Sequence, residues 1–108
     1  MLVGNIALNV VMMSKVINVK HYDGEYIPIH RGTIWGNPYK IGIDGNRNEV
    51  IEKYEKYIRS NDILMAELPK LENEVLGCFC KPKQCHGDVI VKLLKERRVL
   101  NDSKICNN

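Results

Sequence analysis

The most constraining feature of this sequence is a pattern near the C-terminal end of the chain that predicts a buried strand, a short loop and then a helix. Residues 74–80 (EVLGCFC) form an apolar run bounded by polar residues, which is typical of a buried strand. Gly77 within the run indicates that another group approaches closely on one side. After the loop 81–84, apolar residues recur at helical spacing and predict a helix from about Cys85 to Arg98. A buried strand followed by a helix is typical of a parallel sheet.

Two further strands are predicted near the start of the chain. The segment Lys15–Lys20 (KVINVK) is rich in β-branched residues and predicts the first core strand. The segment 25–30 (EYIPIH) predicts a short edge strand, because Pro28 cannot donate a hydrogen bond to a central ladder.

The long loop 31–46 separates these strands from two predicted helices. Asn46 and Glu49 have the spacing of a capping box at the start of a helix near 47–59. A second helical stretch covers 62–68 and ends near the following proline. This order of elements predicts an α/β fold: a single small Rossmann-like domain with a mainly parallel sheet flanked by helices.

The length of 108 residues fits one domain. We expect residues 1–12 to be an N-terminal extension outside the core, 13–100 to form the single α/β domain, and 101–108 to be a polar C-terminal tail. No apolar run approaches the roughly 20 residues that span a bilayer, so we expect no membrane partner. A core of this size leaves room for a homodimer.

The charge distribution argues against a nucleic-acid partner. The net charge is +3, and all of the excess lies in residues 92–108, where basic side chains also stabilise a helix C-terminus. A dedicated duplex binder has a basic face instead. Four cysteines without a secretion signal indicate a reduced, cytoplasmic protein without disulfides.

The densest cluster of reactive side chains is CFCKPKQCHGD, residues 78–88. It spans the predicted end of a strand and the start of the last helix, where ligands bind in open α/β sheets. The N–H groups of a helix N-terminus suit a phosphate or carboxylate, and Gly87 would let such an anion approach without a Cβ in the way. The same terminus would lower the pKa of a thiol such as Cys85.

A second cluster is HRGTIWGNPY, residues 30–39. Arg31 can form a two-pronged contact with a phosphate or carboxylate. Trp35 can stack on a base, although closing the core under the loop is an equally open role for it. Asn37 offers a donor and an acceptor to a base edge or a ribose.

Together the two clusters resemble the domain-of-unknown-function 4326 family, whose members occur in phages and bacteria. The resemblance covers about residues 15–96, with both blocks in the expected order. It implies a shared small α/β fold and site, and the phage context suggests capture of a nucleotide-type immune signal. His30 stands where family members often carry a glycine, so we do not assign it to the site. The matching residues are Arg31, Gly32, Trp35, Gly36, Asn37, Pro38, Cys78, Cys80, Pro82, Cys85, His86, Gly87 and Asp88.

The leading hypothesis is therefore a domain that binds a phosphate-bearing, nucleotide-derived small molecule at the C-terminal edge of the sheet, without a cofactor. The anion would lie on the last helix with Arg31 closing over it, while Trp35 and Asn37 contact the base or sugar. The expected ligand-binding residues are Arg31, Gly32, Trp35, Gly36, Asn37, Cys80, Cys85, His86, Gly87 and Asp88.

Two alternatives stay open. A nucleoside or nucleotide hydrolase or transferase would use Asp88 or a cysteine thiolate, with Cys80, Cys85 and His86 as the other catalytic candidates. A zinc-stabilised interaction module would use Cys78, Cys80, Cys85 and His86, whose types suit zinc although their spacing departs from paired Cys-x2–4-Cys knuckles. We expect no metal, and Cys78 is then a small buried hydrophobe.

Overall fold

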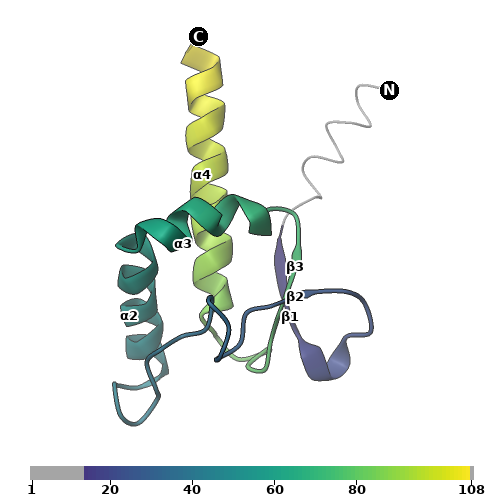
Figure 1. Cartoon of the computed structure of the whole chain (residues 1–108), viewed down its shortest axis with the longest axis vertical. Helices are drawn as coiled ribbons and strands as arrows, with labels where there is room; N and C mark the ends of the chain where they lie inside the picture. The colour runs from purple at the N-terminus through teal and green to yellow at the C-terminus, as the bar shows by residue number, and fades with distance from the viewer. Residues whose placement is uncertain (1–13, 108) are drawn as a thin grey trace.

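The sheet has three parallel strands with β3 at its centre. The computed structural model describes residues 14–107, in which β1 (Lys15–Asn18), β2 (Ile27–Pro28) and β3 (Val75–Cys78) lie in the order β1-β3-β2 (Figure 1). β1 pairs with β3 from Lys15 opposite Val75, and β2 pairs with β3 at Leu76 and Gly77. The predicted parallel pairing and the edge position of Pro28 are confirmed. The predicted extension 1–12 lies outside the described residues.

Both longer strands end earlier than predicted. β1 ends at Asn18, whose side-chain oxygen accepts a hydrogen bond from the Lys20 N–H and caps a 3-10 turn, η1 (Val19–His21). β3 ends at Cys78, so Phe79 is exposed and Cys80 belongs to the following loop. The chain thus leaves the central strand at the point where the loops of the candidate site begin.

The last helix, α4 (Gly87–Asn107), packs on one face of the sheet. Val16 is in register with Leu76, and a Cβ on Gly87 would lie 2.9 Å from both Val16 methyl groups. This glycine therefore lets the start of α4 approach β1 closely. On the opposite face, a Cβ on Gly77 would overlap the ring of Tyr26, so the close approach predicted at Gly77 is confirmed.

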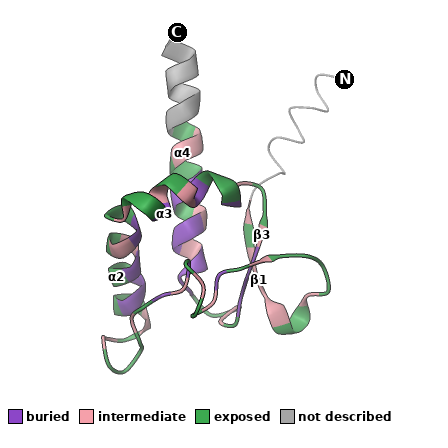
Figure 2. Cartoon of the chain, in the orientation of Figure 1, coloured by how far each residue is buried: buried purple, intermediate pink, exposed green. Residues whose placement is uncertain are grey.

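The helices between β2 and β3 are α2 (Arg47–Arg59) and α3 (Asp62–Glu67), followed by a 3-10 turn, η2 (Leu68–Leu71). The predicted capping box is confirmed, because Asn46 accepts from the Glu49 N–H and the Glu49 carboxylate accepts from the Asn46 N–H. Figure 2 shows the buried positions of α2 and α4 gathered on the sides that face each other.

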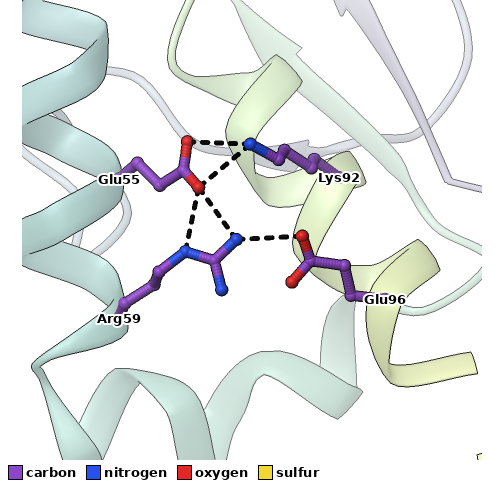
Figure 3. A network of polar contacts seen from close by, with 4 residues as sticks. All are labelled: Glu55, Arg59, Lys92 and Glu96. Carbon is purple, nitrogen blue, oxygen red and sulfur yellow. Dashed lines mark hydrogen bonds and ion pairs between the residues drawn. The ribbon is translucent and has the colours of Figure 1, made fainter. Parts of the chain in front are cut away.

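A network of charged side chains joins α2 to α4 at the surface (Figure 3). Glu55 accepts from Arg59 on its own helix and from Lys92 on α4, and Arg59 also donates to Glu96 at 2.9 Å. Single exposed ion pairs stabilise a fold little, but a network fixes the register of the two helices more firmly. The hydrogen bonds from Lys92 and then from Arg59 hold the pKa of Glu55 below its usual range.

α4 is longer than predicted and continues to Asn107, so Figure 1 shows it projecting past α3. The sequence places no glycine or proline between Asp88 and Asn107, and nothing there ends a helix. Residues 101–107, expected as a polar tail, are therefore helical. None of the helices within residues 14–107 is long and apolar enough to cross a membrane.

Candidate functional site

A cleft of about 190 Å³ lies where the loops that follow β2 and β3 meet the start of α2. This is the carboxyl-terminal edge of the sheet, where open α/β domains bind ligands. Five of the predicted site residues line it: Arg31, Asn37, Cys80, Cys85 and His86. The full lining is His30, Arg31, Asn37, Tyr39, Ile41, Arg47, Val50, Ile51, Phe79, Cys80, Gln84, Cys85 and His86.

Arg31 shapes one wall of this cleft. Its Nη1 donates to the carbonyl oxygen of Asn37, and its Nη2 donates to that of Tyr39 at 3.0 Å. The guanidinium therefore holds the loop in a curve while its charge stays at the cleft. A ligand anion would add to these contacts through the remaining N–H groups of the fork.

Asn37 and Trp35 fix the same loop to α2 and to the core. The Asn37 side chain donates to the Val50 carbonyl oxygen at 3.1 Å and accepts from the Tyr39 N–H at 2.9 Å. Trp35 is only 5% exposed and belongs to the core, where the hydroxyl of Tyr54 donates to its carbonyl oxygen. Trp35 does not line the cleft, so the structure favours its core role over stacking on a ligand.

Gly32 and Gly36, the two glycines of this loop that were predicted to contact the ligand, are required by the backbone. Gly32 has a φ of 102°, a conformation that favours glycine. A Cβ on Gly36 would lie 2.7 Å from the Cα of Arg31, so only glycine fits this close approach. Neither residue lines the cleft; both were predicted to contact the ligand, and they instead give the loop its shape.

His86 connects the floor of the cleft to the sheet. Its Nε2 lies at hydrogen-bond distance from the carbonyl oxygen of Ile29, which fixes Nε2–H as the donor. The ring also packs edge-on against Tyr54, with centroids 5.0 Å apart. Burial lowers the pKa of His86, so its imidazole is neutral at neutral pH.

Of the three cysteines whose side chains the structure describes, Cys78 and Cys85 form a buried pair, and both Cys80 and Cys85 line the cleft. The Sγ atoms of Cys78 and Cys85 are 3.5 Å apart, and both side chains are buried. Burial, together with Cys78, raises the pKa of Cys85 to about 12. The lowering expected from the helix terminus is thus wrong: the hydrogen bond from Gly87 lowers this pKa less than burial raises it. Cys80 is half-buried in the loop.

The start of α4 does not offer the free anion site that the sequence predicted. The N–H groups of Asp88 and Val89 donate to carbonyl oxygens of the preceding turn. The Asp88 carboxylate accepts from the Cys85 N–H and pairs with Lys81. The space beside Gly87 is filled by Val16 and Ile29, and neither Gly87 nor Asp88 lines the cleft. The arginines of the described part of the chain that line the cleft, Arg31 and Arg47, come from the loop after β2 and from α2.

Within residues 14–107, no three histidine, cysteine or acidic side chains gather as metal ligands. Cys78 and Cys85 face each other, but the Nε2 of His86 points to a carbonyl oxygen. The residues that could hold zinc are thus not arranged around one point.

Two important lining residues, Arg47 and Phe79, were missed from the sequence. Arg47 is the first residue of α2, and its Nη1 donates to the Gln84 carbonyl oxygen at 2.9 Å. A cation at a helix N-terminus is electrostatically unfavourable, and this was the available signal for a role other than helix stability. Phe79 is 54% exposed beside His30, with ring centroids 5.3 Å apart, and nothing in the sequence reveals that pair.

Comparison with known proteins finds relatives of this chain in two viruses. The family model described as "Domain of unknown function (DUF4326)" matches residues 15–96. An "Uncharacterized 12.4 kDa protein in nrdA-td intergenic region" of Enterobacteria phage T4 is 41% identical over 104 residues, which cover 88% of this chain and 92% of that protein. "Uncharacterized protein R718" of Acanthamoeba polyphaga mimivirus is 39% identical over 69 residues, covering 56% of this chain and 52% of the relative. No solved structure matches the chain significantly.

Proposed function

This chain belongs to the family of domain of unknown function 4326, and we propose that its cleft binds a phosphate-bearing, nucleotide-derived small molecule. The observation that carries the proposal is the charge of the cleft. Arg31 reaches it from the loop after β2 and Arg47 from the start of α2, and none of the described lining residues is acidic. A concave site with cations and without carboxylates favours an anionic ligand.

The arginine fork suits a phosphate group in particular. A guanidinium offers two parallel N–H donors that match two oxygens of a phosphate, and such charge-assisted hydrogen bonds are the stronger ones. Arg47 makes one hydrogen bond, to Gln84, and has further donors for a ligand. In the proposed complex Arg47 therefore binds the phosphate, and Arg31 donates to the same phosphate from the loop that follows β2.

The exposed apolar groups at the cleft support a planar ligand. Phe79 is 54% exposed and Ile41 is 52% exposed, and both line the cleft. Pockets that enclose a drug-sized ligand have volumes of about 300–1,000 Å³. A cleft of about 190 Å³ therefore encloses only part of a nucleotide. The phosphate and sugar would enter it, and the base would lie outside against the Phe79 ring.

Binding without turnover is favoured over hydrolysis or transfer. Asp88 pairs with Lys81 outside the cleft, and the raised pKa of Cys85 disfavours its thiolate. Of the predicted catalytic candidates, only Cys80 and His86 then remain as reactive groups at the cleft. Because relatives occur in a phage and a giant virus, capture of a host nucleotide signal is the role we propose for such binding.

The experiment is a binding panel with product analysis. The four ribonucleoside 5′-monophosphates, their nucleosides, inorganic phosphate and cyclic di-AMP are titrated against the full chain by calorimetry, and each mixture is then analysed by mass spectrometry. We expect at least one phosphorylated compound to bind, its nucleoside to bind at least tenfold more weakly, and the ligand to be recovered unchanged. Conversion of the ligand would establish the enzyme instead. Binding by none of the probes, with no small molecule co-purifying, would contradict the proposal.

A further inference from the structure

A second, larger hollow of about 830 Å³ lies between α4 and β1, the strand at one edge of the sheet. Its apolar surface comes from Val16 on β1 and from Val91 and Val99 on α4. Val99 is 63% exposed, and the other two are half-buried. We call this hollow the β1–α4 groove. A row of apolar side chains left open on a small domain is normally covered by another apolar segment.

Four of the six charged residues that line the groove form ion pairs within the chain. Lys81 pairs with Asp88, and in the network of Figure 3 Lys92 pairs with Glu55 while Glu96 pairs with Arg59. These four charges have partners without any occupant of the groove. The other two, Lys15 and Lys95, are exposed and keep their charges in water. The groove therefore suits an uncharged, apolar segment better than a charged partner.

The sequence carries such a segment at the mouth of the groove. Residues 1–13 (MLVGNIALNVVMM) contain no charged residue, and ten of the thirteen are apolar. They join the described chain at Ser14, which itself lines the groove. The Ser14 hydroxyl donates to the Leu71 carbonyl oxygen at 2.6 Å, which anchors the connection at that place.

Residues 1–13 are long enough to reach along the groove. From Asp88 to Val99 the groove follows about 17 Å of α4, at the helical rise of about 1.5 Å per residue. Thirteen residues span about 20 Å as a helix and about 43 Å when extended. The segment can therefore reach along the whole groove in either conformation.

We propose that residues 1–13 bind in the β1–α4 groove of their own chain and cover Val16, Val91 and Val99. The segment is then an extension in sequence but a stabilising part of the folded molecule. An N-terminal extension outside the core, as expected from the sequence for residues 1–12, could be removed without a change in Tm. A segment bound in the groove could not.

The first test is a thermal unfolding cycle on the full chain, a variant lacking residues 2–12, Val99→Asp, and the two changes combined. Each single change should lower Tm by at least about 5 °C, and the combination should lower it no further than the larger single effect, because both remove the same contact. Ile63→Asp is the matched control: Ile63 is 77% exposed on α3, and its effect should add to that of the truncation. An unchanged Tm on truncation, or additive effects with Val99→Asp, would overturn the proposal.

The second test needs no variant and identifies the occupant. Methyl-labelled full chain is examined by NMR for contacts between the methyl groups of Val91 or Val99 and those of residues 2–11. We expect these contacts in a fully labelled sample and not in the filtered spectrum of a mixture of labelled and unlabelled chains. Contacts that appear only between chains would assign the groove to a second copy, and absence of all such contacts would leave the segment without this role; either result overturns the proposal.

Discussion

The Nε2 of His86 donates a hydrogen bond to the carbonyl oxygen of Ile29, and this contact joins the two segments that form the cleft. Ile29 follows β2 and lies two residues before Arg31, whereas His86 directly precedes α4. Both partners are buried, and the edge-on packing of His86 on Tyr54 ties the same point to α2. The position of the cleft wall therefore depends on one neutral imidazole.

This dependence predicts a loss of stability in mild acid. The pKa of His86 is lowered by burial, whereas an unfolded histidine has a pKa of about 6.5. Below about pH 6.5 the unfolded chain binds more protons than the folded one, so stability is full above that pH and falls as pH decreases. One such proton contributes at most about 1.4 kcal/mol per pH unit.

Chemical denaturation between pH 7.5 and 5 measures this effect. His86→Gln should lower stability at pH 7.5 by about 0.5–1.5 kcal/mol, the net contribution of one hydrogen bond, and should flatten the pH dependence. His21→Gln changes an exposed histidine and serves as the control. A pH dependence that survives His86→Gln unchanged would show that another group causes it.

The burial of the cysteine pair predicts selective alkylation. In the native protein iodoacetamide should modify Cys80 well before Cys78 and Cys85, because the latter two are buried and the pKa of Cys85 is raised to about 12. Peptide mapping by mass spectrometry follows each site, and all three should react alike in denaturant. Equal native rates at Cys80 and Cys85 would revive Cys85 as a nucleophile.

The core position of Trp35 predicts a stability effect. Trp35→Ala should lower the free energy of unfolding by about 3–5 kcal/mol, as for other buried large-to-small changes. Ile43→Ala, at a position 77% exposed in the same loop region, should change it by less than about 0.5 kcal/mol. Both are measured by urea denaturation. A small effect of Trp35→Ala on stability with a large effect on ligand affinity would restore the stacking role.

The helix cap and the edge strand of this fold could be predicted from the sequence, because each depends on residues that are close together in the chain. The capping box at Asn46 and Glu49 and the edge position of Pro28 follow from one residue's own chemistry or from its near neighbours. The parallel pairing of β1 with β3 followed from the long helical connection between them.

The distant contacts of the site could not be predicted in the same way. The sequence shows that Gly87 is small but not that Val16 and Ile29 fill the space beside it. It likewise shows that Arg31 is a cation but not that two loop carbonyls bind its guanidinium. Such roles depend on side chains that the fold brings together from distant parts of the chain, and no short sequence pattern reveals them.

The central claim is that the cleft binds a phosphate group through Arg47, and calorimetry on two matched variants tests it most directly. The ligand is the tightest-binding ribonucleoside 5′-monophosphate of the panel. Arg47→Gln should weaken its binding about ten- to a hundredfold, the loss of one charge-assisted contact of about 1.5–3 kcal/mol. Lys56→Gln removes the same charge from an exposed position of α2 that does not line the cleft, and it should leave affinity within about twofold. Equal affinities of Arg47→Gln and Lys56→Gln would contradict the proposed site.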